Sequence, residues 1–351
     1  MAPVRAAIVG TGNIARTHVK SYRATPGVEV VGACDILRDR VDQFVKDWAI
    51  PAGYYSVAEM VERARPDIVS ICTRVDQHLE PTLEAARPGV KLVFVEKPMA
   101  YTLAEADRMI AHCRANGVRL ATDHTQRWEP GRLLALEMLR RGDIGDLLGV
   151  HVHCPGDLGE LHNNGTHWFD VMRMYAGDAR WVVCHVLRDP ARREDREYVR
   201  GMIGFDGPVI GNITYGGFHD YRRGMITLEG STGQIRLSNA GSWTPEMHLW
   251  LADRDATDYV QCGRDVAVPV GDPFDGAIGA MVRAVQEDRE PESNGEEGRR
   301  SVEMLVACYE SHRRGNSRVD LPLPGGADPL RDMRADGTLP SIFARGLGRK
   351  D

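Results

Sequence analysis

An apolar run near the start of the chain leads into closely spaced glycines, a pattern that can bind a phosphate. Gly10, Gly12 and Ala15 fit the pattern G-x-G-x-x-A. The first glycine permits a tight turn, the second lets the backbone approach a pyrophosphate at a helix N-terminus, and the small third residue allows close packing of helix on strand. We therefore predict a dinucleotide site that includes Gly10, Gly12, Asn13 and Ile14.

The second apolar run ends in an acidic residue, Asp35. A carboxylate at the end of the second strand accepts hydrogen bonds from the ribose hydroxyls of NAD and repels the 2′-phosphate of NADP. Arg38 is close in sequence and could partly offset that repulsion, although a solvated helix residue is the simpler interpretation. We predict NAD as the cofactor and keep NADP as the less favoured alternative.

The first third of the chain shows the elements that must position these groups. Short apolar runs alternate there with helical patterns, which is typical of a parallel sheet buried on both faces. Two capping-box pairs mark helix starts, Ser56 with Glu59 and Thr102 with Glu105. The apolar runs cover residues 6–9, 28–34, 68–72, 92–95 and 118–121. We predict an α/β fold with an N-terminal Rossmann dinucleotide-binding domain over residues 1–125.

The pattern changes after this domain. Strand-like runs joined by glycine-containing turns fill most of residues 181–270, and two amphipathic helices return near the end. We predict an α+β domain over residues 126–325, with a large, mostly antiparallel open sheet that serves substrate binding and oligomerisation. Residues 326–351 are rich in glycine, proline, aspartate and arginine, and we expect a tail on the surface or on a partner subunit.

Composition argues against several kinds of partner. The formal charge of -6 offers no basic field for nucleic acid. No stretch approaches the roughly 20 apolar residues that cross a bilayer. Seven cysteines occur singly, without a C-x-x-C pair, which argues against a disulfide framework and against a metal site. The first residues lead straight into a strand, so we expect no signal peptide and a cytoplasmic protein.

A later strand end carries the tripeptide Glu96-Lys97-Pro98. A G-x-G-x-x-A start, an E-K-P about ninety residues later and an α+β second half resemble the Gfo/Idh/MocA oxidoreductases, which include glucose-fructose oxidoreductase, inositol dehydrogenases and many sugar dehydrogenases. The loop from Thr73 to His78 matches the family's T-P-x-x-x-H, except that arginine replaces the proline. The resemblance implies that Lys97 lies beside the nicotinamide and the reacting hydroxyl. It also implies a cis peptide bond before Pro98, and cofactor contacts from Thr73, His78 and Glu96.

The resemblance implies a second catalytic element in a helix that reads approximately D-x-x-x-H-x-x-D in the family. His167 then takes the role of general base or acid, and Asp170 orients it or binds substrate. Positions 163, 167 and 170 share one face of a helix. Asn163 stands where many members have aspartate, and an amide can bind a hydroxyl but cannot take a proton. Proton transfer would then rest on Lys97 and His167.

Further side chains could face the substrate. Arg127 matches a position often found beside the active site in the family. Aromatic and arginine side chains suit a polyol, because they offer apolar faces and hydrogen-bond donors. The other candidates are Trp128, His153, His219, Tyr221 and Arg222, and sheet packing or a surface position remains open for each.

These observations predict an NAD-dependent dehydrogenase that oxidises a secondary hydroxyl of a sugar, sugar derivative or cyclitol, with the proton taken by Lys97 or His167. A lyase or hydrolase that retains NAD and cleaves a glycoside through transient oxidation remains an alternative, and would explain Asn163. A non-catalytic NAD-binding sensor is a second alternative. The resemblance also implies a homodimer or homotetramer, assembled through the exposed face of the second domain's sheet.

Overall fold

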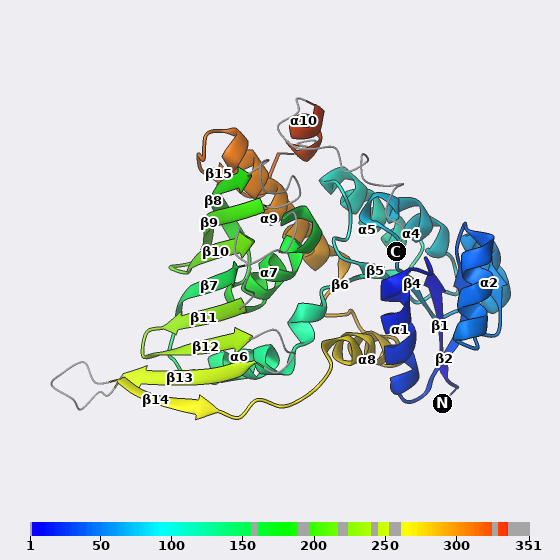
Figure 1. Cartoon of the computed structure of the whole chain (residues 1–351), viewed down its shortest axis with the longest axis horizontal. Helices are drawn as coiled ribbons and strands as arrows, with labels where there is room; N and C mark the ends of the chain where they lie inside the picture. Colours follow the sequence, from blue (N-terminus) through cyan, green and yellow to red (C-terminus); the bar gives the residue numbers. More distant parts are fainter. Residues whose placement is uncertain are drawn as a thin grey trace. The chain divides into compact units, whose positions relative to one another are not determined.

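The computed structural model describes residues 2–155, 161–188, 197–216, 224–239, 245–252, 261–324 and 329–335. The chain divides into two compact units, each with its own β-sheet (Figure 1). The first unit consists of residues 1–135 and 268–302, and the second of residues 136–267 and 303–351. None of the helices in the described part of the chain is long and apolar enough to span a membrane.

The first unit contains a six-stranded parallel sheet in the order β3-β2-β1-β4-β5-β6. Chain order reverses between β1 and β4, and in open sheets of this kind ligands bind at that point, beyond the carboxyl ends of the strands. The strands are β1 (Val4–Val9), β2 (Val28–Cys34), β3 (Gly53–Tyr54), β4 (Ile68–Ile71), β5 (Leu92–Glu96) and β6 (Arg119–Asp123). The predicted parallel sheet is confirmed, and each predicted run overlaps a strand.

Helices connect these strands, as the sequence pattern indicates. Ser56 accepts a hydrogen bond from the backbone of Glu59, and Thr102 forms a reciprocal capping box with Glu105. The predicted capping box is confirmed at Thr102, and at Ser56 the structure shows the N-cap hydrogen bond from the Glu59 backbone. The helices are α1 (Asn13–Ala24), α2 (Arg38–Asp47), α3 (Val57–Ala64), α4 (Leu79–Ala85) and α5 (Leu103–Ala115), with a 3₁₀ turn η1 (Val75–Gln77) before α4.

A late segment of the chain completes the first unit. Helix α8 (Pro273–Gln286) packs against α1 and against the 3₁₀ turn η2 (Thr125–Trp128). Its buried side chains, such as Ile278 and Met281, belong to the same hydrophobic core as residues of β1 and α1. The chain then pairs with the edge of β6, where the Ser293 carbonyl accepts from the backbone of Thr122 at 2.8 Å. The first unit is therefore discontinuous in sequence.

The second unit is built on a nine-stranded sheet in the order β14-β13-β12-β11-β7-β10-β9-β8-β15. Neighbouring strands are antiparallel except for β7 and β10, so the predicted large, mostly antiparallel sheet is confirmed. The strands are β7 (Leu147–Pro155), β8 (Ala179–Arg188), β9 (Glu197–Phe205), β10 (Ile210–Gly216), β11 (Gly224–Gly230), β12 (Gly233–Asn239), β13 (Glu246–Ala252), β14 (Gln261–Val266) and β15 (Val319–Asp320).

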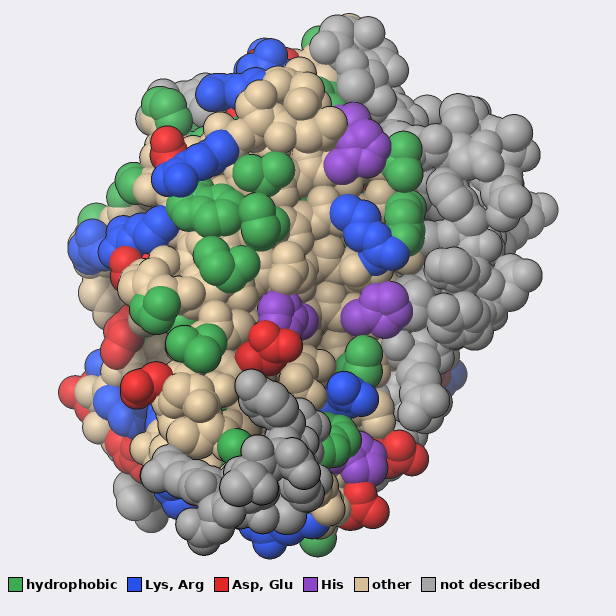
Figure 2. All heavy atoms as spheres, turned by 90° about the vertical axis from the view of Figure 1, so that its left-hand side faces the viewer, with side chains coloured by type: hydrophobic (Ala, Val, Ile, Leu, Met, Phe, Trp, Pro, Cys, Tyr) green, Lys and Arg blue, Asp and Glu red, His purple; other side chains and the backbone are tan. Residues whose placement is uncertain are grey.

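One face of this sheet is buried and the other is open. Alternate residues such as Val182 and Val186 of β8 are buried, and α7 (Leu161–Ala176) packs on β7, β9 and β10. On the opposite face Leu187 and Met202 are 43% and 42% exposed. Figure 2 looks onto this outer face, where histidine, charged and hydrophobic side chains lie next to one another. The remaining helices are α6 (Pro130–Arg140), α9 (Gly295–Arg313) and α10 (Pro329–Ala335), the last within the predicted tail.

Candidate active site

The glycine turn after β1 needs its first glycine for steric reasons. Gly10 has φ +86°, a conformation that side chains disfavour. A Cβ at this position would lie 2.9 Å from backbone atoms of Cys72 and Thr73. The backbone N–H of Gly10 donates to the Cys34 carbonyl at 2.8 Å. The turn is thus held between the ends of β2 and β4.

The second glycine stands at the N-terminus of α1 and leaves space in front of it. Gly12 is the N-cap residue, and no atom in the described part of the chain lies within 4 Å of where its Cβ would be. No described side chain caps this terminus, and the first turn, which begins with Asn13 and Ile14, contains no acidic residue. The first backbone N–H groups of a helix point outward and attract anions. The open cradle therefore fits the pyrophosphate of a dinucleotide.

Asp35 lies beside this turn. Its Oδ2 accepts hydrogen bonds from the backbone N–H and the hydroxyl of Thr11, both at 2.8 Å, and its Oδ1 accepts from the Leu37 N–H at 3.0 Å. The Arg38 guanidinium stacks over the ring of Tyr55, 4.3 Å from its centroid. The carboxylate thus stands where ribose hydroxyls would lie, and the nearby arginine is engaged with a tyrosine. Both features fit NAD.

Lys97 follows the last residue of β5, at the carboxyl edge of the sheet. The Lys97–Pro98 peptide bond is cis, as the resemblance implied. Burial lowers the pKa of Lys97 because it disfavours the ammonium form, while the charges of Glu96 and Asp123 act in the opposite direction. A lysine with a lowered pKa is more often neutral near neutral pH, so this amine can accept a proton.

His78 connects the two loops that flank this edge. It is buried, and its Nδ1 faces the carbonyls of Pro98 at 3.0 Å and Met99 at 3.2 Å. Its Nε2 lies 3.0 Å from the carbonyl of Thr73. Burial lowers the pKa of His78, and these carbonyls only partly offset that effect. The structure therefore places His78, with Thr73, as a link that fixes the loop carrying Lys97.

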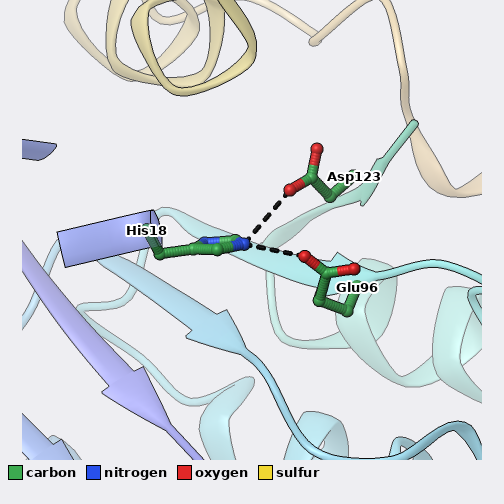
Figure 3. Close-up of side chains that lie close together, drawn as sticks. All are labelled: His18, Glu96 and Asp123. Atoms are coloured by element: carbon green, nitrogen blue, oxygen red, sulfur yellow. Dashed lines mark hydrogen bonds and ion pairs between the residues drawn. The ribbon is translucent and has the colours of Figure 1, made fainter. Parts of the chain in front are cut away.

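Two residues that the sequence reasoning missed, His18 and Asp123, lie beside Glu96 (Figure 3). Glu96 and Asp123 are registered neighbours at the ends of β5 and β6. The Nε2 of His18, from α1, lies 2.9 Å from Glu96 Oε1 and 3.1 Å from Asp123 Oδ2, and its Nδ1 lies 3.2 Å from the Ser70 hydroxyl. The apolar runs of β5 and β6 each end in an acidic residue, Glu96 and Asp123. This shared feature of neighbouring strands was the signal that could have revealed Asp123.

His18, Glu96 and Asp123 form a buried cluster in which the groups shift one another's pKa values. Burial opposes the imidazolium of His18, yet Cys72 and the two carboxylates raise its pKa overall. Burial would raise the pKa of Glu96, but His18 and Lys97 more than offset it, so this pKa is lowered. Asp123 behaves differently, since burial and the charge of Glu96 raise its pKa to about 6. Near neutral pH the cluster therefore pairs a cationic ring with two carboxylates.

Two predicted substrate residues belong to η2 in the first unit. Arg127 is 8% exposed, and its guanidinium lies 3.5 Å from Glu297. Trp128 is also 8% exposed and is part of the hydrophobic core, where a Cβ at Gly276 of α8 would lie 3.1 Å from it. The structure thus places Trp128 in packing against α8 and Arg127 beside a carboxylate.

The second unit carries the histidine helix. His167 lies in the middle of α7 and is half-buried, whereas Asp170 is fully buried. Asn163 belongs to the first turns of the same helix, but its side chain lies outside the described part. His153 occupies a position in β7 that belongs to the outer face of the sheet. His219, Tyr221 and Arg222 lie outside the described residues.

Comparison with protein-family models assigns both parts of the chain. Residues 4–124 match the oxidoreductase family's NAD-binding Rossmann fold, and residues 137–321 match the C-terminal alpha/beta domain of the same family. The chain belongs to the Gfo/Idh/MocA oxidoreductase family. The resemblance inferred from Gly10, Gly12 and Glu96-Lys97-Pro98 is therefore confirmed.

Relatives of this Gfo/Idh/MocA protein include several named enzymes. D-apiose dehydrogenase of Paraburkholderia graminis is 22% identical over 340 residues, 89% of this chain and 88% of the relative. Inositol 2-dehydrogenase of Salmonella typhimurium is 33% identical over 119 residues, 33% of this chain and 35% of the relative. Among solved structures, levoglucosan dehydrogenase in complex with NADH and L-sorbose superimposes with a TM-score of 0.80 at 18% identity, covering 92% of this chain and 100% of that one.

A buried carboxylate anchors the histidine helix of this family member. Glu197, at the start of β9, is 1% exposed. Its Oε2 accepts hydrogen bonds from the backbone N–H of Leu161, the first residue of α7, at 2.7 Å and from the Tyr309 hydroxyl at 2.8 Å. This contact fixes where the helix that carries His167 begins.

Replacing Glu197 by alanine is expected to destabilise the second unit by about 2–4 kcal/mol, because two buried donors lose their acceptor. Hydrogen exchange of the α7 amides should accelerate, and the denaturant midpoint should fall. Tyr309→Phe, which removes one donor and keeps the ring, serves as the matched control with a loss of about 1 kcal/mol. Unchanged exchange in α7 of the Glu197→Ala protein would contradict the anchoring role.

Proposed function

We propose that this chain is an NAD-dependent dehydrogenase that oxidises a secondary hydroxyl of a sugar, sugar derivative or cyclitol. The observation that carries the proposal is Lys97, whose pKa is lowered by burial and whose loop is fixed at the carboxyl edge of the sheet that also carries the glycine turn. The substrate class is supported by the names of relatives, which act on apiose and inositol.

The first unit would bind the cofactor. The pyrophosphate would lie at the N-terminus of α1, in the space before Gly12, and Asp35 would accept hydrogen bonds from the ribose hydroxyls. Gly10 keeps the turn tight, and Asn13 and Ile14 begin the helix. Thr73, His78 and Glu96 hold the loops around Lys97. Bound NAD supplies the hydride acceptor, which is the chemistry that no side chain of this chain can provide.

The proton of the hydroxyl must leave as the carbon becomes a carbonyl. We assign its transfer to Lys97, whose neutral amine can accept it, together with His167 of α7 as the second acid-base group. Asn163 and Asp170 of the same helix, with Arg127, would hold the neighbouring hydroxyls. An amide at 163 can bind a hydroxyl without competing for the proton.

We also propose that the protein is a cytoplasmic homo-oligomer. The outer face of the nine-stranded sheet exposes Leu187 and Met202, and in the described part of the chain no second layer packs on it. A single-layer sheet gains stability when its open face is covered, and a second copy of the same face would cover it. No disulfide joins the cysteines in the described part of the chain, which fits a reducing compartment.

The test is a panel of sugars, cyclitols and glycosides incubated with NAD, read by NADH formation and by product mass. A product lighter by two hydrogens, formed in step with NADH, is the expected result. Lys97→Met protein should bind NAD and give neither signal, because methionine matches the four-atom stem of the lysine side chain and lacks the amine. Glycoside cleavage without NADH would instead indicate transient oxidation, and NAD binding with every compound unchanged would indicate a sensor.

A further inference from the structure

A tyrosine from the edge strand leaves the sheet beside Asp35. Strands β2 and β3 are parallel, with Cys34 opposite Tyr54, so the residues that follow them, Asp35 and Tyr55, stand at the same carboxyl edge. The backbone N–H of Asp35 donates to the Tyr54 carbonyl at 3.2 Å. Because β2 lies between β1 and β3 in the sheet, Asp35 stands between the glycine turn that follows β1 and Tyr55.

An arginine follows Asp35 closely in the chain. Arg38 is the first residue of α2, and the turn before it is closed by Asp35, whose Oδ1 accepts from the Leu37 N–H at 3.0 Å. A carboxylate at this place binds the ribose 2′-hydroxyl of NAD, whereas a nearby arginine accommodates the 2′-phosphate of NADP. The chain therefore carries one group that favours each cofactor.

The guanidinium of Arg38 is held on the ring of Tyr55. Its central carbon lies 4.3 Å from the ring centroid, a distance at which a cation is attracted to the face of an aromatic ring. The Tyr55 hydroxyl donates to Asp42 Oδ1 at 2.8 Å. Asp42 follows Arg38 by four residues in α2, so both project from the same side of that helix. Tyr55 is therefore fixed by one residue of this helix face while it binds another.

We propose that Tyr55, fixed by Asp42, is a specificity-determining residue for the cofactor: its ring engages the Arg38 guanidinium and so withholds it from the 2′-phosphate of NADP. The inference rests on the proposed contact between Asp35 and the ribose, and it does not depend on the oxidation. An arginine that binds the phosphate has to give up the ring, which subtracts from the affinity for NADP. The preference for NAD then has two sources, the charge of Asp35 and the engaged Arg38.

A direct contact between Tyr55 and the adenosine is the competing explanation. The side chain is 37% exposed, so part of its ring is open to a ligand. Such a contact would serve both cofactors alike, because NAD and NADP differ only in the 2′-phosphate. Engagement of Arg38 concerns NADP alone. The affinities of the same variants for the two cofactors therefore separate the two explanations.

The experiment measures the Kd of NAD and of NADP by isothermal titration calorimetry on the full chain, without substrate. Tyr55→Leu removes the ring and releases Arg38. Arg38→Ala removes the charge, and the double variant completes a thermodynamic cycle. Arg40→Ala is the matched control, because this arginine lies two positions further along α2 and points in another direction. Tyr55, Arg38 and Arg40 are all exposed, so these variants should fold.

A second background makes weak binding of NADP measurable. Asp35→Asn keeps the shape of the side chain and removes the charge that repels the 2′-phosphate, so NADP should bind more tightly. The Tyr55→Leu, Arg38→Ala and double variants are therefore made both in the unmodified chain and in Asp35→Asn protein. The effect of releasing Arg38 should have the same direction in both.

Tyr55→Leu is expected to lower the Kd of NADP about three- to fivefold, because an exposed cation–π contact no longer competes for the arginine. The Kd of NAD should change less than about twofold, since NAD has no group that Arg38 would bind. The gain for NADP should vanish when Arg38→Ala is added and persist when Arg40→Ala is added. Tyr55→Phe keeps the ring and loses the hydrogen bond to Asp42, so its gain should be smaller than that of Tyr55→Leu.

Three results would overturn the proposal: an unchanged Kd of NADP in Tyr55→Leu, a gain that survives Arg38→Ala, or equal losses of affinity for both cofactors. The last of these would show that Tyr55 contacts the adenosine directly. The expected shift in a protein that oxidises no compound of the panel would leave this inference standing and remove the proposed function. Oxidation of a sugar by a chain whose cofactor preference ignores Tyr55 would do the reverse.

Discussion

His167→Ala protein is expected to turn over its substrate about 10²–10⁴ times more slowly than the unmodified chain, which is the usual contribution of a positioned acid-base group. His167 is half-buried in the middle of α7, so its ring is partly accessible while its backbone is held by the helix. Removing the ring should leave NAD binding and the unfolding midpoint close to those of the unmodified protein. Steady-state kcat with the best compound of the panel, measured beside NAD affinity, tests this.

Two controls separate chemistry from structure in that experiment. Free imidazole should restore part of the activity of His167→Ala, because it can enter the space that the ring leaves. His162→Asn changes the neighbouring histidine, which is buried at 4% exposure and points in another direction from the helix. It should cost stability while kcat changes little. Equal kcat in His167→Ala and the unmodified chain would rule out the assigned role.

Gly10→Ala is expected to lower the free energy of unfolding of the first unit by about 3 kcal/mol or more. The new Cβ would approach backbone atoms of Cys72 and Thr73 to 2.9 Å, and the residue would have to keep φ +86°. Backbone cannot yield as a flexible side chain can, so the end of β4 must shift. NAD affinity should fall roughly 100-fold or more, because the turn that holds the pyrophosphate moves with it.

Gly12→Ala is the matched control for this turn. Its Cβ would meet no atom of the described chain within 4 Å, so folding should be unaffected. NAD affinity should still fall at least about tenfold, because that Cβ takes the space through which the pyrophosphate approaches. Denaturant unfolding without cofactor and NAD titration distinguish the two variants. Similar unfolding free energies for Gly10→Ala and Gly12→Ala would contradict the steric argument.

Local sequence signals predicted most of the fold. The apolar run of residues 28–34 coincides with β2, and the reciprocal pair Thr102 and Glu105 caps α5 as expected. Strand ends were harder, because β5 and β6 continue through Glu96 and Asp123, which are charged and do not resemble buried strand residues. The two-residue strand β3 is too short to produce a periodic pattern.

The candidate site was also predictable only where its residues lie close together in sequence. The turn at Gly10 and Gly12 was visible because its glycines lie close together in sequence. The cluster of His18, Glu96 and Asp123 was missed because its members are brought together only by strand register and by the packing of α1. The apolar stripe of α8 shows that this helix is buried but not against which surface. The roles of Lys97 and His167 stay predictions until they are tested.

The path of the chain limits how this protein could be divided or recombined. The backbone passes between the two units three times, near residues 135, 267 and 302. A fragment that stops at the first passage keeps the glycine turn but lacks α8, so the part of α1 that packs against α8 is left uncovered. A single cut in the chain therefore cannot separate the cofactor-binding unit from the second unit, either for expression alone or for exchange with another protein. Transplanting it onto another substrate-binding half requires three splices that are made together.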